Sequence, residues 1–162
     1  MITWLTDTII GKMTMTFLIS MLPVVELRLG LPYGMAIGLT GKLYPLALLS
    51  AVVGNLLPVP FIILFIKNVF AFLRARLKKM DGFITRLEER AHLKSEVVKK
   101  YGAIGLCLLV AIPLPGTGAW TGALVAALMG LDLKRAMPSI IIGVLIAAAI
   151  MTGVTFGVIH FS

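Results

Sequence analysis

The stretch Pro23-Val-Val-Glu26-Leu-Arg28-Leu-Gly-Leu-Pro32 places two charges and two prolines inside the apolar run 17–39. A charged side chain at the centre of a bilayer costs about 2.5–3.5 kcal/mol, so such residues usually pair or face a cavity. Each proline lacks an amide donor and disfavours helix at the residue before it. The helix that remains is too short to cross about 30 Å of hydrocarbon. We therefore expect a re-entrant hairpin, whose backbone is covered by protein or lines a water-filled cavity.

A second stretch, Ala111-Ile-Pro-Leu-Pro-Gly-Thr-Gly-Ala-Trp-Thr-Gly122, carries no charge. Its prolines and glycines nevertheless interrupt the apolar run 101–129 in the same way, and each arm beside the interruption is too short to span a membrane. The sequence predicts a second re-entrant hairpin. We expect the two broken tips to meet and to form a polar site.

The composition is that of a membrane protein. The 162 residues are 59% hydrophobic and 14% charged, with a mean hydropathy of +1.04, which predicts a single membrane domain. The formal net charge is +8, and ten of the fifteen Lys and Arg residues lie in segment 67–100. Basic residues beside membrane spans usually lie on the cytoplasmic side, so we expect this segment in the cytoplasm. We do not interpret its charge as a sign of nucleic-acid binding.

The rest of the N-terminal half contains one short helix and one span. Residues 2–20 include several threonines and predict a helix that lies at the interface or enters the membrane obliquely. Residues 43–66 are long enough for a full span. Pro58 and Pro60 predict a kink in this span, and Lys67 is expected to end it.

The connector and the C-terminal end are also predicted to be helical. Apolar residues in segment 67–100 repeat at steps of three and four, which is typical of an amphipathic helix. Asp81-Gly82 is expected to split it into two short helices. Residues 139–159 predict a last span, with Pro138 in its first turn, where a missing donor costs little.

The two halves resemble each other when the sequence is shifted by 92 positions. The matched positions are Pro23 with Pro115, Gly30 with Gly122, Gly34 with Ala126, Gly38 with Gly130 and Lys42 with Lys134. With the basic segment inside, the first hairpin opens outside and the second opens inside. The repeats are then inverted, a pattern that points to a transporter's binding site near the midplane.

The expected fold is therefore an all-α polytopic membrane protein with two inverted repeats. Each repeat is a re-entrant hairpin followed by a transmembrane helix. Residues 1–66 hold the N-terminal helix and the first repeat, residues 67–100 form a cytoplasmic amphipathic connector, and residues 101–162 hold the second repeat.

Glu26-Leu-Arg28 followed by Pro32, with Pro113-Leu-Pro-Gly-Thr-Gly-Ala-Trp-Thr-Gly122, resembles the small multidrug export protein family over nearly the whole chain. The layout is also similar to the wider DedA superfamily. The resemblance implies a transporter of the bacterial or archaeal inner membrane. The DedA layout implies lipid or polyprenyl phosphate transport coupled to protons or sodium, although this chain has one acidic residue in its first hairpin and no arginine in its second.

Glu26 is the only carboxylate predicted at membrane depth. Burial disfavours its ionised form and Arg28 favours it, so this carboxylate is suited to bind and release a proton during transport. The alternative is a permanent structural pair of Glu26 and Arg28 that holds the hairpin closed. Arg28 also offers a planar fork for a phosphate or carboxylate headgroup.

Both tips and the kinked span contribute to the predicted substrate and ion site. The backbone amides of residues 116–122 precede a helix and are a candidate anion site, or these glycines serve the turn and close packing. The hydroxyls of Thr117 and Thr121 are expected to line the cavity. The ring of Trp120 either lines the cavity or anchors at an interface, and Asn55 is expected to bond a hairpin tip. The predicted site comprises Pro23, Glu26, Arg28, Pro32, Asn55, Pro113, Pro115, Thr117, Trp120 and Thr121.

These residues predict secondary transport of a small amphipathic or lipid-phosphate substrate, coupled to a proton or sodium ion. The alternatives are a non-transporting scaffold that assembles through glycine-rich helix faces, and an uncoupled lipid scramblase. No catalytic constellation, metal-ligand cluster or cofactor motif is found in the sequence, which argues against an enzyme. Membrane lipids are expected partners, and a second copy of the chain is a candidate partner that would cover the backbone of the short hairpins.

Overall fold

The computed structural model describes residues 7–23, 25–77, 81–114 and 117–161, and the secondary structure in these ranges is helical. In chain order the elements are α2 (Ile9–Met21), α3 (Glu26–Ala36), the 3-10 turn η1 (Gly41–Leu43), α4 (Tyr44–Leu56), α5 (Pro58–Arg76), α6 (Asp81–Ala111), α7 (Ala119–Leu128) and α8 (Leu133–Phe161). Within the described ranges this confirms the all-α prediction.

Two helical segments are long and apolar enough to cross a membrane. They are Gly41–Arg76, which contains η1, α4 and α5, and Leu133–Gly157 of α8, each with a mean hydropathy of 2.3. The boundary between α4 and α5 falls at Leu57, whose φ of −56° and ψ of −45° stay helical, and the kink stays a prediction. The prediction that Lys67 ends the helix was wrong, because α5 continues to Arg76. A lysine retains its amide donor and is a good helix former, so it does not interrupt the bonding pattern.

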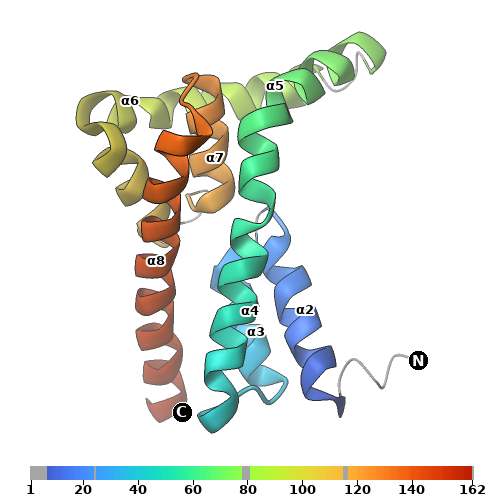
Figure 1. Cartoon of the computed structure of the whole chain (residues 1–162), viewed down its shortest axis with the longest axis vertical. Helices are drawn as coiled ribbons and strands as arrows, with labels where there is room; N and C mark the ends of the chain where they lie inside the picture. Colours follow the sequence, from blue (N-terminus) through green and yellow to red (C-terminus); the bar gives the residue numbers. More distant parts are fainter. Residues whose placement is uncertain (1–6, 24, 78–80, 115–116, 162) are drawn as a thin grey trace.

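The first hairpin consists of α2 and α3, which follow each other in the chain and pack side by side. Its open end lies near the start of α4 (Figure 1). The first arm of this hairpin is α2, and Pro32 lies inside α3. Pro32 was wrongly expected to break the helix. A proline there removes only the bond to the carbonyl of Arg28, four residues earlier.

The second hairpin consists of the last part of α6 and α7, and it enters from the opposite end of the molecule (Figure 1). Gly102, with φ 57° and ψ −131°, bends α6. The part of α6 before this bend lies across the end of the molecule, and the part after it runs beside α8. The segment 67–100 was predicted to divide into two helices at Asp81-Gly82, and the structure has two helices there, α5 ending at Arg76 and α6 beginning at Asp81.

The last helix begins earlier than predicted. α8 starts at Leu133, so Pro138 is its sixth residue and lies inside the helix, not in its first turn. The acceptor that loses its donor is the carbonyl of Lys134, close to the amino end of α8, where the helix loses one bond and continues.

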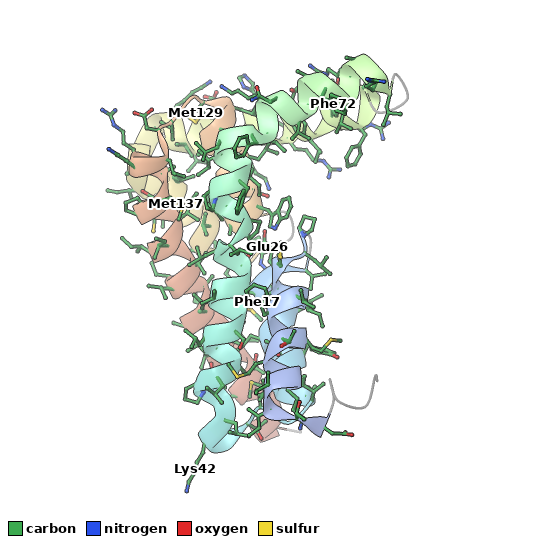
Figure 2. The ribbon with its side chains drawn as sticks, turned by 45° about the vertical axis from the view of Figure 1, so that its right-hand side comes forward. Phe17, Glu26, Lys42, Phe72, Met129 and Met137 are labelled. Carbon is green, nitrogen blue, oxygen red and sulfur yellow. The ribbon has the colours of Figure 1, made fainter. Side chains whose placement is uncertain are left out.

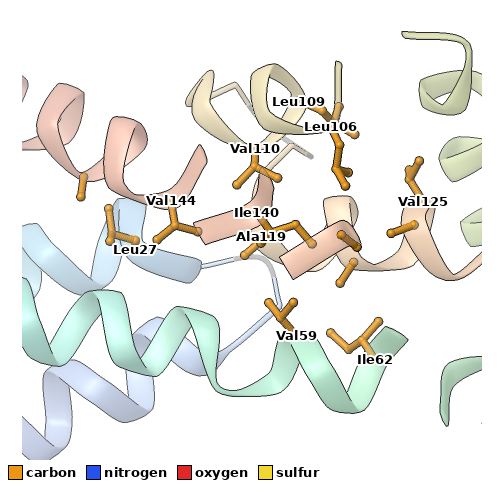
Figure 3. Packing of buried hydrophobic residues seen from close by; sticks show 14 of the residues in the cluster. Leu27, Val59, Ile62, Leu106, Leu109, Val110, Ala119, Val125, Ile140 and Val144 are labelled. Carbon is orange, nitrogen blue, oxygen red and sulfur yellow. The ribbon is translucent and has the colours of Figure 1, made fainter. Parts of the chain in front are cut away.

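Small and β-branched residues form the core between the hairpins and the two spans. Side chains from α3, α5, α6, α7 and α8 converge there (Figure 3). The labelled ones are Leu27, Val59, Ile62, Leu106, Leu109, Val110, Ala119, Val125, Ile140 and Val144. Glycines allow close approach of helices at Gly54, which faces the backbone of Phe17, and at Gly143, which faces Cys107 and Val110.

The second arms of the two hairpins end in two separate turns of the same type. The amide of Leu39 donates to the carbonyl of Gly34 at 3.0 Å, and that of Leu131 donates to Ala126 at 2.9 Å. The preceding glycine has a positive φ in both turns, 101° at Gly38 and 70° at position 130. Glycine tolerates this conformation, which explains why it ends both helices.

Candidate functional site

Glu26 lies where the two hairpin tips meet, about midway between the end of the molecule marked by Lys42 and the end marked by Met129 (Figure 2). Its side chain is 5% exposed. Glu26 Oε1 accepts a hydrogen bond from the backbone amide of Trp120, in the first turn of α7, at 3.2 Å. The carboxylate of the first hairpin therefore occupies the positive amino end of a helix in the second hairpin, a favourable place for an anion.

The backbone of Glu26 is itself unusual. Its φ is 49°, the one positive φ outside glycine among the described residues. A side chain in this left-handed region costs about 1–2 kcal/mol. Such conformations persist where surrounding contacts enforce them, and they concentrate at functional sites. The cost of this conformation is offset by contacts that hold the carboxylate against α7.

Arg28 makes the second connection between the tips. One guanidinium nitrogen donates to the carbonyl of Thr117 at 2.7 Å and to its hydroxyl at 2.6 Å. The same nitrogen also donates to the carbonyl of Ile112 at 3.5 Å. The other terminal nitrogen donates to the carbonyl of Leu114. The planar fork of arginine suits this cluster of acceptors better than a lysine ammonium would.

Thr117 holds the second tip in the shape that Arg28 binds. Its hydroxyl accepts from the amide of Leu114 at 3.2 Å and lies 2.7 Å from the carbonyl oxygen of Ile112. Trp120 adds a third link, because its indole nitrogen donates to the carbonyl of Met21 at 3.1 Å. We call the bonds that join Glu26, Arg28 and Met21 to residues 112–120 the cross-tip contact.

The structure brings together four residues of the predicted site, Glu26, Arg28, Thr117 and Trp120. The other six predicted residues are not part of this group. Pro23 is exposed in the first tip, Pro113 is half-buried in the second, Pro32 lies in α3, Thr121 follows Trp120 in α7, Asn55 is buried at the end of α4, and Pro115 lies outside the described residues. Their roles stay predictions.

The list of predicted site residues omitted Gly118 and Lys94, although the amides of residues 116–122 were predicted as a candidate anion site and that of Trp120 does bind the Glu26 carboxylate. Gly118 is buried with φ 123°, and a Cβ atom there would overlap the Glu26 carboxylate. A glycine just before a helix is the signal that could have found it. Burial and the charges of Arg28 and Arg90 lower the pKa of Lys94, and the charge of Glu26 raises it. The charge of Lys94 thus interacts with the tips, although the sequence places this residue in the connector.

The helical fold and two segments that are long and apolar enough to cross a membrane indicate a helical membrane protein. The chain belongs to the family described as "putative small multi-drug export protein", whose profile matches residues 26–150. This confirms the resemblance found in the sequence, and the family description indicates a transporter-like role. No curated protein and no solved structure matches the chain.

Proposed function

We propose that the protein is an ion-coupled secondary transporter of the bacterial or archaeal inner membrane. Its substrate is a small amphipathic or lipid-phosphate molecule that passes the cross-tip contact. The observation that carries this proposal is the buried Glu26 carboxylate, which belongs to one hairpin and is bound by the other. Ionisable side chains at membrane depth are expensive and usually serve a pathway for ions or substrates.

The proposed topology makes both hairpins re-entrant from opposite faces. It is supported by the positions of the basic residues along the long axis. The basic residues of α6, with Lys134 and Arg135 at the start of α8, lie at the end where the second hairpin opens. Lys42 lies at the other end, where the first hairpin opens. The positive-inside rule then places the α6 end in the cytoplasm.

The proposed inverted repeat is supported by backbone bonds that match after the shift of 92 positions. The bond from Leu39 to Gly34 corresponds to the bond from Leu131 to Ala126. Two further pairs follow the same shift, Ile37 to Tyr33 with Met129 to Val125, and Leu43 to Thr40 with Arg135 to Asp132. Inverted repeats allow one hairpin to open while the other stays closed, which is the basis of alternating access.

The cross-tip contact suggests how coupling would work. Protonation of Glu26 removes the charge that the amino end of α7 stabilises, which weakens the bond between the tips. Once the tips separate, Arg28 loses its carbonyl acceptors and can hold an anionic headgroup with its planar fork. Ion binding and substrate binding are thereby linked through the same contact.

The test is substrate-dependent ion flux in liposomes that contain the wild type, Glu26→Gln or Arg28→Ala. Lipid phosphates and cationic drugs are the candidate substrates, and Glu96→Gln is the matched control because Glu96 is exposed on α6, paired with Lys99. We expect flux in the wild type and the control, and its loss in both site variants. Equal flux in Glu26→Gln would refute the proposed coupling.

The alternatives give different outcomes in the same liposomes. An uncoupled scramblase would move lipid between leaflets without any ion flux, and a scaffold would show neither. Protein that is folded, by its circular dichroism and its elution as one species in detergent, and that moves no candidate substrate would favour the scaffold.

A further inference from the structure

Two buried oxygen atoms near the first tip have no hydrogen-bond partner among the described residues. They are the hydroxyl oxygen of Ser20 and the amide oxygen of Asn55, in side chains that are 0% and 3% exposed. More than nine in ten buried polar groups in proteins are hydrogen-bonded. An unsatisfied buried acceptor is costly, so this pair calls for a bound ion or water.

The two oxygens lie on neighbouring helices, near the point where the backbones of α2 and α4 approach each other. The closest backbone approach of α2 and α4 joins Phe17 to Gly54, where a Cβ atom on the glycine would overlap the carbonyl oxygen of Phe17. Ser20 follows Phe17 by one helical turn on α2, and Asn55 follows Gly54 directly on α4. Figure 1 places the end of α2 beside the break between α4 and α5.

Both side chains point into the interior of the first repeat. Ser20 touches Gly30 of α3 so closely that a Cβ atom on this glycine would overlap its hydroxyl. Asn55 shares a helix face with Ala47 and Ala51, four and eight residues earlier, which are fully buried. The same face of α4 meets α2 and α3 one layer below, where Thr16 and Ala47 both approach Gly34.

The electrostatics at this point favour a cation. Ser20 lies in the last turn of α2 and Asn55 in the last turn of α4, and neither turn contains a basic residue. The carboxyl end of α2 carries a partial negative charge, whereas α4 continues into α5 through Leu57, which keeps helical φ and ψ. Pro58 follows α4 and cannot donate to the carbonyl of Gly54, four residues earlier, which adds a further oxygen acceptor.

We propose that Ser20, Asn55 and the carbonyl of Gly54 bind a small monovalent cation, with sodium as the physiological ligand. Neutral oxygens from broken helix ends are the usual ligands of sodium in transporters. Calcium and magnesium draw on carboxylates, and none of these three ligands is one. The direct backbone contact of α2 with α4 leaves little room, which favours sodium over the larger potassium ion.

The first experiment measures thermal unfolding of the full chain in detergent with sodium, potassium or choline chloride at equal ionic strength. A ligand that binds only the folded state raises the melting temperature with its concentration. We expect a saturable rise with sodium, little with potassium and none with choline. Ser20→Ala and Asn55→Leu should lose the sodium-dependent rise, and Ser139→Ala, at a buried serine of α8, should keep it.

Equal melting temperatures in the three salts would overturn the proposal and leave an ordered water at these oxygens. A sodium-dependent rise that both variants retain would also overturn it, because the ion would then bind elsewhere. Asn55→Asp is a second variant, which tests the site even if Asn55→Leu does not fold. It keeps the oxygen and adds a charge, so sodium binding measured with radioactive sodium should be kept or tightened, and weaker binding would contradict the assignment.

The role of this ion in coupling rests on the proposed function, whereas its binding does not. Sodium binding without transport of any candidate substrate would refute the transporter and retain the ion site. Transport that is equal in sodium and in choline, by a protein whose melting temperature is insensitive to sodium, would retain the transporter and refute the ion site.

Discussion

Replacing Gly118 by alanine tests whether the Glu26 carboxylate holds the two hairpins together. Gly118 has φ 123° and ψ −169°, a conformation restricted almost entirely to glycine. A side chain there costs about 1–3 kcal/mol in backbone strain. Its Cβ atom would also overlap the carboxylate, which must then leave the amide of Trp120. A hydrogen bond to a charged group contributes about 1.5–3 kcal/mol.

The expected loss in the free energy of unfolding is therefore about 3–6 kcal/mol, a large part of the 5–15 kcal/mol that is typical of a folded protein. Circular dichroism during unfolding in mixed detergent micelles measures it. Gly153→Ala is the control. Gly153 is exposed in the middle of α8 with open space around its Cβ position, so alanine should stabilise the helix by about 0.8–1 kcal/mol.

A double-mutant cycle with Glu26→Ala decides whether the carboxylate is the cause. Without the carboxylate, Gly118→Ala should cost only the backbone strain, so the two substitutions should be coupled by about 1.5–3 kcal/mol. Gly118→Ala with wild-type stability, or a cycle without coupling, would refute the view that Glu26 and α7 hold the tips together.

Four further substitutions test other contacts. Arg28→Lys keeps the charge but loses the fork, and we expect about 1–3 kcal/mol less stability by chemical unfolding; wild-type stability would show that the charge alone suffices. Gly54→Ala should overpack against α2 and Gly143→Ala against α6, and each should lower the free energy of unfolding by about 1–3 kcal/mol. A thermal melt in which either variant is as stable as the wild type would contradict that close approach. Tyr44→Phe loses the bond to the Thr152 hydroxyl and should cost about 0.5–1.5 kcal/mol with unchanged substrate flux, whereas reduced flux would place this bond in the transport path.

The sequence predicted where the chain breaks because charges and prolines are visible in it. It located the two tips and anticipated that they meet, since Glu26 and Arg28 need polar partners at membrane depth. It did not identify those partners, because most of them are backbone groups. Carbonyls and amides occur at every residue, so no side-chain pattern reveals which of them Arg28 and Glu26 bind.

The sequence predicted a helix in residues 2–20 but not its pairing with α3, because its threonines lower the apparent hydrophobicity. In the structure Thr14 donates to the carbonyl of Ile10 at 2.8 Å and Thr16 donates to that of Lys12 at 2.9 Å. Hydroxyls satisfied within their own helix are compatible with an apolar environment. Thr16 then packs against Gly34 in the hairpin, so α2 buries Gly11, Thr16 and Ser20 while Ile9, Ile10 and Leu18 stay exposed.

The way Arg28 is held has a consequence for how this family can change over evolution. Its acceptors are the carbonyls of residues 112, 114 and 117 and one hydroxyl. A substitution in the second tip that preserves the backbone path leaves those carbonyls in place. The two tips are therefore free to diverge in side chains, and correlated substitutions between them should be weak although they touch. The acidic and basic residues can accumulate in one hairpin, while selection on the other acts mainly on the prolines and glycines that shape its main chain.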